Sequence, residues 1–190
     1  MKEKKEDRRV RITKQAIKES LIELMQKCPI SKISVKMLCE TADINRSTFY
    51  AHYADQYDLL RKIQEEIILS IKEYVFDKRF TERSEITIPV LIQILEYAKA
   101  NTALFKVLLS ENGDFSFQDE LMFLAQEKTI EEIREDQRLD DRTAKYLEIF
   151  AISGFMSIIR KWLEDGAFDE PEKLAELITN LLFQGVSSYY

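Results

Sequence analysis

Only four glycines and three prolines interrupt the 190 residues of this chain. These two residue types end helices and mark turns, so their scarcity favours long, uninterrupted helices. Apolar residues recur along most of the chain at the three- and four-residue spacing of a helix face, and no long stretch alternates with the two-residue period of a strand. We therefore predict an all-α protein of about nine helices.

The predicted helices form two groups. The first group contains helices at about 7–27, 34–42 and 46–53. A long helix at about 55–80 follows, and then helices at about 86–99, 101–110, 115–136, 139–165 and 171–187. Ser34 and Asp55 are the predicted N-caps, residues 111–114 and 165–167 are predicted turns, and Pro171 fits the first position of the last helix. This grouping predicts two domains, residues 1–54 and 55–190.

Charge is distributed unevenly between these two parts. Residues 1–56 contain 12 Lys and Arg against 8 Asp and Glu, a net charge of +4, whereas residues 57–190 contain 16 against 26, a net charge of -10. A basic region at one end allows an acidic protein to bind nucleic acid. No stretch approaches the ~18 apolar residues of a membrane span, and MKEKKEDRRVR lacks the apolar core of a signal peptide. We expect a cytoplasmic protein without a membrane partner.

The sequence offers little for catalysis or metal binding. Two cysteines, Cys28 and Cys39, and one histidine, His52, are too few for an ordinary zinc ligand set. No motif supplies a nucleophile or carboxylate partner for His52, and no glycine-rich phosphate loop is present. We expect a protein that is not an enzyme and that has no metal or cofactor, with His52 in a structural or DNA-facing role.

Two short predicted helices, 34–42 and 46–53, match the plan of a helix-turn-helix. In that motif the second helix enters the major groove of DNA and leads with its N-terminal residues. Arg46, Ser47 and Thr48 would open the inserted helix, while Phe49 and Tyr53 would face the core. Spacing alone leaves an ordinary pair of surface helices as an equal alternative, and the basic N-terminal arm favours the helix-turn-helix.

The stretch ISVKMLCETADINRSTFYAHYADQYDLL resembles the DNA-binding signature of the TetR family of bacterial transcriptional regulators, and the likeness extends over about residues 10–60. The resemblance implies an all-helical homodimer that binds double-stranded operator DNA through its N-terminal domain and carries a larger regulatory domain. The segment ISGFMSIIRKWLEDG, followed by a proline and an apolar last helix, weakly resembles C-terminal domains of such regulators from low-GC Gram-positive bacteria.

The resemblance also assigns residues to the DNA interface. The family's groove-facing positions fall on Lys36, Arg46, Ser47, Thr48, Tyr50 and His52, and Ser34 stands where a capping hydroxyl often meets a phosphate. Asp43 replaces the usual turn glycine, so we expect a left-handed residue held there at some cost. Gln56 replaces a phosphate-binding lysine, which predicts weaker and less salt-dependent DNA binding than a lysine would give.

The segment from Ile149 to Ile159 is apolar on every side, which one core-facing stripe does not explain. Such a helix is covered twice, either inside the core of a monomer or by its own core and a second subunit. The last helix also has a broad apolar stripe, so two helices from each subunit would form a four-helix dimer interface, in agreement with the family. The predicted interface residues are Leu147, Ala151, Phe155, Ile158, Trp162, Leu174, Ile178 and Leu181.

Aromatic residues of the second domain are candidates for the lining of a ligand pocket, although each is also explained as plain core. The predicted pocket residues are Tyr97, Phe105, Phe123 and Phe150. Glu96 and Glu148 would favour a cationic ligand if they were buried. We expect a repressor that a small-molecule inducer releases from a palindromic operator. The alternative is the same fold controlled by a protein partner or by no ligand.

Overall fold

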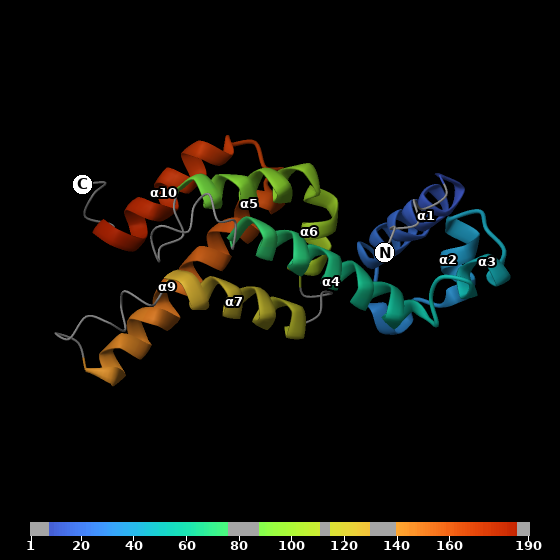
Figure 1. Ribbon diagram of the computed structural model, residues 1–190, viewed down its shortest axis with the longest axis horizontal. Helices are drawn as coiled ribbons and strands as arrows, with labels where there is room; N and C mark the ends of the chain where they lie inside the picture. Colours follow the sequence, from blue (N-terminus) through green and yellow to red (C-terminus); the bar gives the residue numbers. More distant parts are fainter. Residues whose placement is uncertain (1–7, 76–87, 111–114, 130–139, 186–190) are drawn as a thin grey trace, which may run out of the picture. The chain divides into compact units, whose positions relative to one another are not determined.

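The computed structural model describes residues 8–75, 88–110, 115–129 and 140–185. All regular structure in these ranges is helical (Figure 1), which confirms the predicted all-α class. The helices are α1 (Arg8–Met25), α2 (Val35–Thr41), α3 (Arg46–Tyr50), α4 (Gln56–Val75), α5 (Ile88–Ala100), α6 (Thr102–Leu108), α7 (Phe115–Thr129), α9 (Asp141–Glu164) and α10 (Pro171–Gln184), with a 3₁₀ turn, η1 (Ile30–Lys32), between α1 and α2.

Two differences from the predicted elements concern the region of the predicted helix-turn-helix. The 3₁₀ turn η1 was not predicted, because three residues are too few to show a helical apolar period. Helix α3 ends at Tyr50 rather than at residue 53. The predicted helix ends at 7, 76–80, 86–87, 130–136, 139 and 186–187, and the predicted turn at 111–114, lie outside the described residues.

The chain divides into two compact units, and the division falls inside α4 between Ile67 and Ile68. The sequence analysis places its domain boundary before this helix, at 54/55. Helix α4 thus contributes its first turns to the N-terminal unit and its last turns to the C-terminal unit. Each unit has buried apolar side chains from several helices, as expected for separate cores.

The N-terminal unit packs α1 against α2 and α2 against α3. Its core contains side chains that are almost completely excluded from solvent, contributed by each of its four α-helices: Ile17, Leu21, Leu38, Phe49 and Leu59. Fully burying a side chain of this size contributes roughly 1.5–3 kcal/mol relative to an exposed position. A core of this size therefore accounts for the ordering of α2 and α3, which are too short to be stable alone.

Helix α4 begins with a capping arrangement on two aspartates. Asp55 Oδ1 accepts hydrogen bonds from the backbone N–H groups of Tyr57 and Asp58, each at 2.8 Å, which confirms the predicted N-cap. Asp58 Oδ2 accepts a hydrogen bond from Ala54 N–H at 3.0 Å and lies 3.0 Å from Lys62 Nζ, while Arg61 contacts its other oxygen. These interactions fix the start of α4 directly after the α3 segment.

The C-terminal unit is a helical bundle in which α5 and α10 lie side by side and α6 and α7 pack against α9 (Figure 1). Its most deeply buried side chains are Leu95, Leu108, Leu163, Ala175 and Ile178. The turn between α9 and α10 is closed by two hydrogen bonds, from Ala167 N–H to Trp162 O (2.8 Å) and from Trp162 Nε1–H to Asp169 O (3.1 Å). Pro171 opens α10, as predicted.

Asp58 makes a testable contribution to stability in acid. The hydrogen bond from Ala54 N–H, together with Lys62 and Arg61, lowers the pKa of the Asp58 carboxyl from 3.8 to about 2. A lowered folded-state pKa adds stability that is present above about pH 4 and is lost as the pH falls towards 2. We expect the free energy of unfolding of the wild type to fall more steeply than that of Asp58→Asn over this range. Denaturant titrations at stepped pH measure both slopes.

An NMR titration of the Asp58 carboxyl provides the control for this prediction. Lys62→Gln removes one of the groups that stabilise the ionised form, so the pKa of Asp58 should rise towards its usual value. Parallel stability curves for the wild type and Asp58→Asn between pH 4 and 2 would show that these contacts do not persist in solution.

Candidate nucleic-acid interface and regulatory cavity

Helix α2 begins at a side-chain cap. Ser34 has extended backbone angles, and its Oγ accepts a hydrogen bond from the backbone N–H of Met37 at 3.3 Å. This confirms Ser34 as the N-cap predicted from the sequence. The hydroxyl is exposed and accepts this bond, so its proton can still be donated outward. Ser34 is therefore placed to cap the helix and to bind an anion at the same time.

A tight turn connects α2 to α3. Asp43 has φ 52°, the left-handed conformation predicted for this position, and Ile44 N–H donates a hydrogen bond to Cys39 O at 3.0 Å. Asn45 has extended backbone angles and precedes α3 without a side-chain cap. The turn joins the two short helices within four residues, which is the arrangement of a helix-turn-helix.

One face of α3 is anchored and the other is exposed. The Phe49 ring is completely buried, and it contacts the buried Tyr53 ring with centroids 5.7 Å apart. Arg46, Ser47 and Tyr50 are exposed, and Ser47, two residues before Phe49, lies on the side of the helix away from the buried ring. The Tyr50 ring stands edge-on to Phe49 with 57% of its surface exposed. The buried ring thus fixes the direction in which the exposed side chains point.

The remaining predicted DNA-contact residues surround this face. Thr48 and His52 are half-buried. Lys36 is exposed on α2, with its Nζ 3.7 Å from a carboxylate oxygen of Glu40 one helical turn on. At this distance and exposure the pairing with Glu40 is weak, so it leaves Lys36 available to a phosphate.

The cysteines of this unit belong to the fold. Both are free thiols, and burial raises the pKa of the Cys39 thiol, although the positive charge of Arg46 partly opposes the rise. A raised pKa keeps a thiol protonated and unreactive. Within the described ranges no group of three or more His, Cys, Asp or Glu side chains is placed to hold a metal ion, and no helix there is long and apolar enough to cross a membrane.

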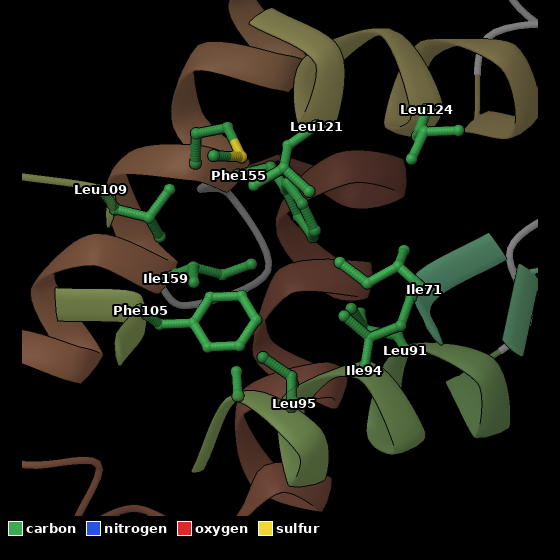
Figure 2. A pocket seen from close by; sticks show the side chains of 12 residues that line it. Ile71, Leu91, Ile94, Leu95, Phe105, Leu109, Leu121, Leu124, Phe155 and Ile159 are labelled. Carbon is green, nitrogen blue, oxygen red and sulfur yellow. The ribbon is translucent and has the colours of Figure 1, made fainter. Parts of the chain in front are cut away.

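The C-terminal unit contains an apolar cavity of about 70 Å³, which we call the regulatory cavity after the role that we propose for it. Side chains from α4, α5, α6, α7 and α9 point into it (Figure 2). Its lining consists of Ile71, Leu91, Ile94, Leu95, Ala98, Phe105, Leu109, Leu121, Leu124, Phe155, Met156 and Ile159. Every lining residue carries a hydrocarbon or thioether side chain.

Of the four predicted pocket residues, one lines this cavity. Phe105 lines it, and Tyr97 packs edge-on against the Phe105 ring with centroids 5.8 Å apart, outside the lining. Phe123 and Phe150 are 61% and 76% exposed and do not line it. The aliphatic lining was not predicted, since leucines and isoleucines at helical spacing carry no signal that separates a cavity wall from solid core.

The predicted dimer-interface residues differ in their burial. Trp162, Leu174 and Ile178 are buried within their own unit, and Phe155 lines the regulatory cavity. Ala151, Ile158 and Leu181 are half-buried. Leu147 is exposed, as are three apolar residues beside it on α9 that were not predicted to be in the interface, Tyr146, Ile149 and Phe150.

The family of the chain is decided by its C-terminal half. Residues 86–184, more than half of the chain, match a TetR-type family model described as a transcriptional regulator C-terminal region. The chain belongs to the TetR family of transcriptional regulators. No curated protein sequence matches the chain.

Solved structures share the fold of this TetR-family chain along almost its whole length. A TetR transcriptional regulator from Streptococcus agalactiae is 24% identical (93% of this chain, 96% of that chain, TM-score 0.63). The dihydroxyacetone kinase operon activator DhaS is 23% identical (93% and 97%, TM-score 0.56). The regulator FadR from Bacillus subtilis, in complex with stearoyl-CoA, is 12% identical (90% and 98%, TM-score 0.65). These are regulators and not enzymes, and at such identities they establish the fold alone.

The left-handed turn residue of this TetR-family chain yields a prediction. Asp43→Gly removes the Cβ that opposes φ 52°, so we expect stability to rise by a few tenths to about 1 kcal/mol, with part of the gain offset by a more flexible unfolded chain. Asp43→Ala removes the same carboxylate without relieving the conformation and should lower stability. Urea denaturation measures both. Equal stabilities for the two variants would assign the effect to charge rather than to the backbone.

Proposed function

We propose that this TetR-family chain is a homodimeric repressor that binds a palindromic operator through α3 and is released by a ligand in the regulatory cavity. The observation that carries the proposal is the anchored α3, whose buried Phe49 holds Arg46, Ser47 and Tyr50 outward behind the left-handed turn at Asp43. This is the arrangement that presents side chains at the N-terminal end of a recognition helix to base edges.

The chemistry of the exposed residues fits the two kinds of contact that DNA binding requires. Arg46 has a planar guanidinium that can donate two hydrogen bonds to guanine O6 and N7, which gives sequence preference. Hydroxyl and imidazole groups beside it can also hydrogen-bond to DNA, and they belong to Ser47, Thr48, Tyr50 and His52. Ser34 and Lys36 at the start of α2 are suited to phosphates, which position the protein without reading sequence.

The proposed dimer interface uses the exposed face of α9. This face carries the apolar residues Leu147, Phe150 and Ile158, whose spacings of three and eight residues place them on one side of the helix. Gly154 lies between them and has open space where a Cβ would stand. A helix from a second copy can therefore approach closely at Gly154 and cover the apolar side chains around it. A two-fold axis through this point makes the face self-complementary, and the operator of such a dimer is palindromic.

Arg46→Ala tests the proposed recognition. An operator is first selected from random duplexes with the full-length protein. If Arg46 contacts a guanine edge, its loss should weaken operator binding by about 1–3 kcal/mol and relax the preference at one base pair in each half-site. Lys36→Ala is the comparison, because loss of a phosphate contact should weaken all sequences alike and reduce the salt dependence. A uniform loss for Arg46→Ala would reassign it to the backbone.

Phe150→Glu tests the proposed dimer. The ring is 76% exposed in the single chain, so the substitution should leave the subunit folded, but it places a charge in the proposed apolar interface. Analytical ultracentrifugation should show monomers with native circular dichroism. Phe168→Glu, at a ring 84% exposed in the turn after α9, is the matched control and should remain dimeric. Dimers of unchanged affinity for Phe150→Glu would exclude this face from the interface.

A further inference from the structure

The lining of the regulatory cavity defines the chemistry of its occupant. We propose that the cavity accepts an uncharged hydrocarbon group and excludes charged groups of either sign, so that any ionic part of a ligand stays outside it. This inference rests on the proposed function in one respect, namely that a ligand bound in the C-terminal unit regulates the protein. It narrows the class of that ligand and replaces the cationic ligand expected from the sequence.

No side chain of the lining carries a charge, and the only groups that attract a cation are the phenyl faces of Phe105 and Phe155. All twelve side chains are hydrocarbons apart from the Met156 thioether, and none carries a carboxylate, ammonium, amide or hydroxyl group. An anion that enters such a space loses its hydration and gains no partner, and a cation gains only a cation–π contact that is much weaker than the hydration it loses, so entry is unfavourable for both. A hydrocarbon loses nothing on entry, because its own transfer out of water is favourable.

The two acidic residues that the sequence analysis associated with a cation are not part of the site. Glu96 is exposed. Glu148 is buried on α9, but it does not line the cavity, and its carboxylate lies 3.7 Å from Lys145 Nζ. Neither carboxylate therefore faces a group inside the cavity.

The polar group beside the lining residue Leu109 is already engaged. The Gln118 amide donates hydrogen bonds to the backbone carbonyls of Leu108 (3.1 Å) and Ser110 (3.3 Å), and its oxygen accepts one from Arg160 (3.3 Å). These bonds tie α7 to the end of α6 and to α9. They hold the amide at the wall of the bundle instead of in the cavity.

The size of the cavity favours occupation by an apolar group over water. Its volume of about 70 Å³ exceeds the roughly 10–15 Å³ that one water needs, but a buried water also needs two to four polar partners. The lining supplies none, so water gains little there. The wall atoms also lack neighbours on the cavity side, and a hydrocarbon restores those dispersion contacts.

A matched pair of small probes tests the inference on the full-length protein. Choline and 3,3-dimethylbutan-1-ol have nearly the same shape and differ by the charge of one central atom. We expect 3,3-dimethylbutan-1-ol, and cyclohexane as a second neutral probe, to raise the melting temperature in a dose-dependent way, since ligands of the native state stabilise it. Choline should give no shift beyond that of sodium chloride at equal ionic strength. An equal or larger shift with choline would overturn the proposal, as would no shift with either neutral probe.

Cavity-filling variants locate the binding. Ala98→Leu and Leu121→Phe each extend a side chain into the space, and each should abolish the shift caused by the neutral probes. Ala98→Ser changes the same position without filling it and should retain most of the shift. Leu121 is half-buried, so its variant keeps the test available if Ala98→Leu does not fold. A neutral-probe shift that persists in a folded filling variant would place the binding elsewhere and refute the assignment.

Operator binding, measured by fluorescence anisotropy on the selected duplex, separates this inference from the proposed function. A selective neutral-probe shift without any DNA binding would leave the cavity chemistry standing and refute the proposed repressor. DNA binding without any neutral-probe shift would leave the proposed DNA-binding role standing and refute the proposed cavity chemistry. If both hold, the neutral probes should lower operator affinity in the wild type and leave it unchanged in the filling variants.

Discussion

The complete burial of the Phe49 ring is the interaction on which the orientation of α3, the proposed recognition helix, depends. Helix α3 has five residues, far fewer than the ~12–15 that an isolated helix needs to be marginally stable in water. Its orientation therefore comes from packing and not from its own hydrogen bonds. With Phe49 held in the core and Asp43 turning the chain in the left-handed conformation, the directions of Arg46, Ser47 and Tyr50 follow from helical geometry.

The features that could be predicted from the sequence are those that local chemistry determines. Ser34 and Asp55 cap their helices because hydroxyl and carboxylate oxygens accept from nearby backbone N–H groups, whatever the rest of the fold does. The left-handed conformation at Asp43 was predicted from the family resemblance, because the family usually has a glycine at this turn position and aspartate tolerates the conformation at some cost. Helix existence and order were also predictable, because a sustained three- and four-residue apolar spacing leaves few alternatives.

The features that could not be predicted depend on which helix packs against which. Apolar residues on both sides of α9 indicate that it is covered twice, but the pattern does not say which side belongs to the core. Trp162 is buried within its own unit, while Phe150 is exposed, although both were predicted from the sequence to have functional roles in the same domain. Phe155, assigned to the interface, lines the regulatory cavity. The cavity wall comes from five helices, so the sequence of no single segment predicts that a cavity forms between them.

Helix α4 gives this division of the chain a physical consequence. Asp58 and Leu59 fix its first turns in the N-terminal unit, and Ile71, three to four turns later on the same helix, lines the regulatory cavity. A ligand in the cavity therefore contacts the helix whose start is tied to the α3 segment through Ala54 and Lys62.

Contact alone does not produce regulation, because a ligand shifts an equilibrium only by its difference in affinity between two states. A hydrocarbon group makes no hydrogen bonds or ion pairs. In this site the difference in ligand affinity between the two states must therefore arise from the volume left between Ile71 and the α5, α7 and α9 side chains of the cavity. Under the proposed function, the state that binds the operator is then the one in which the cavity is too small for the ligand. By linkage the operator must oppose ligand binding with the same free energy.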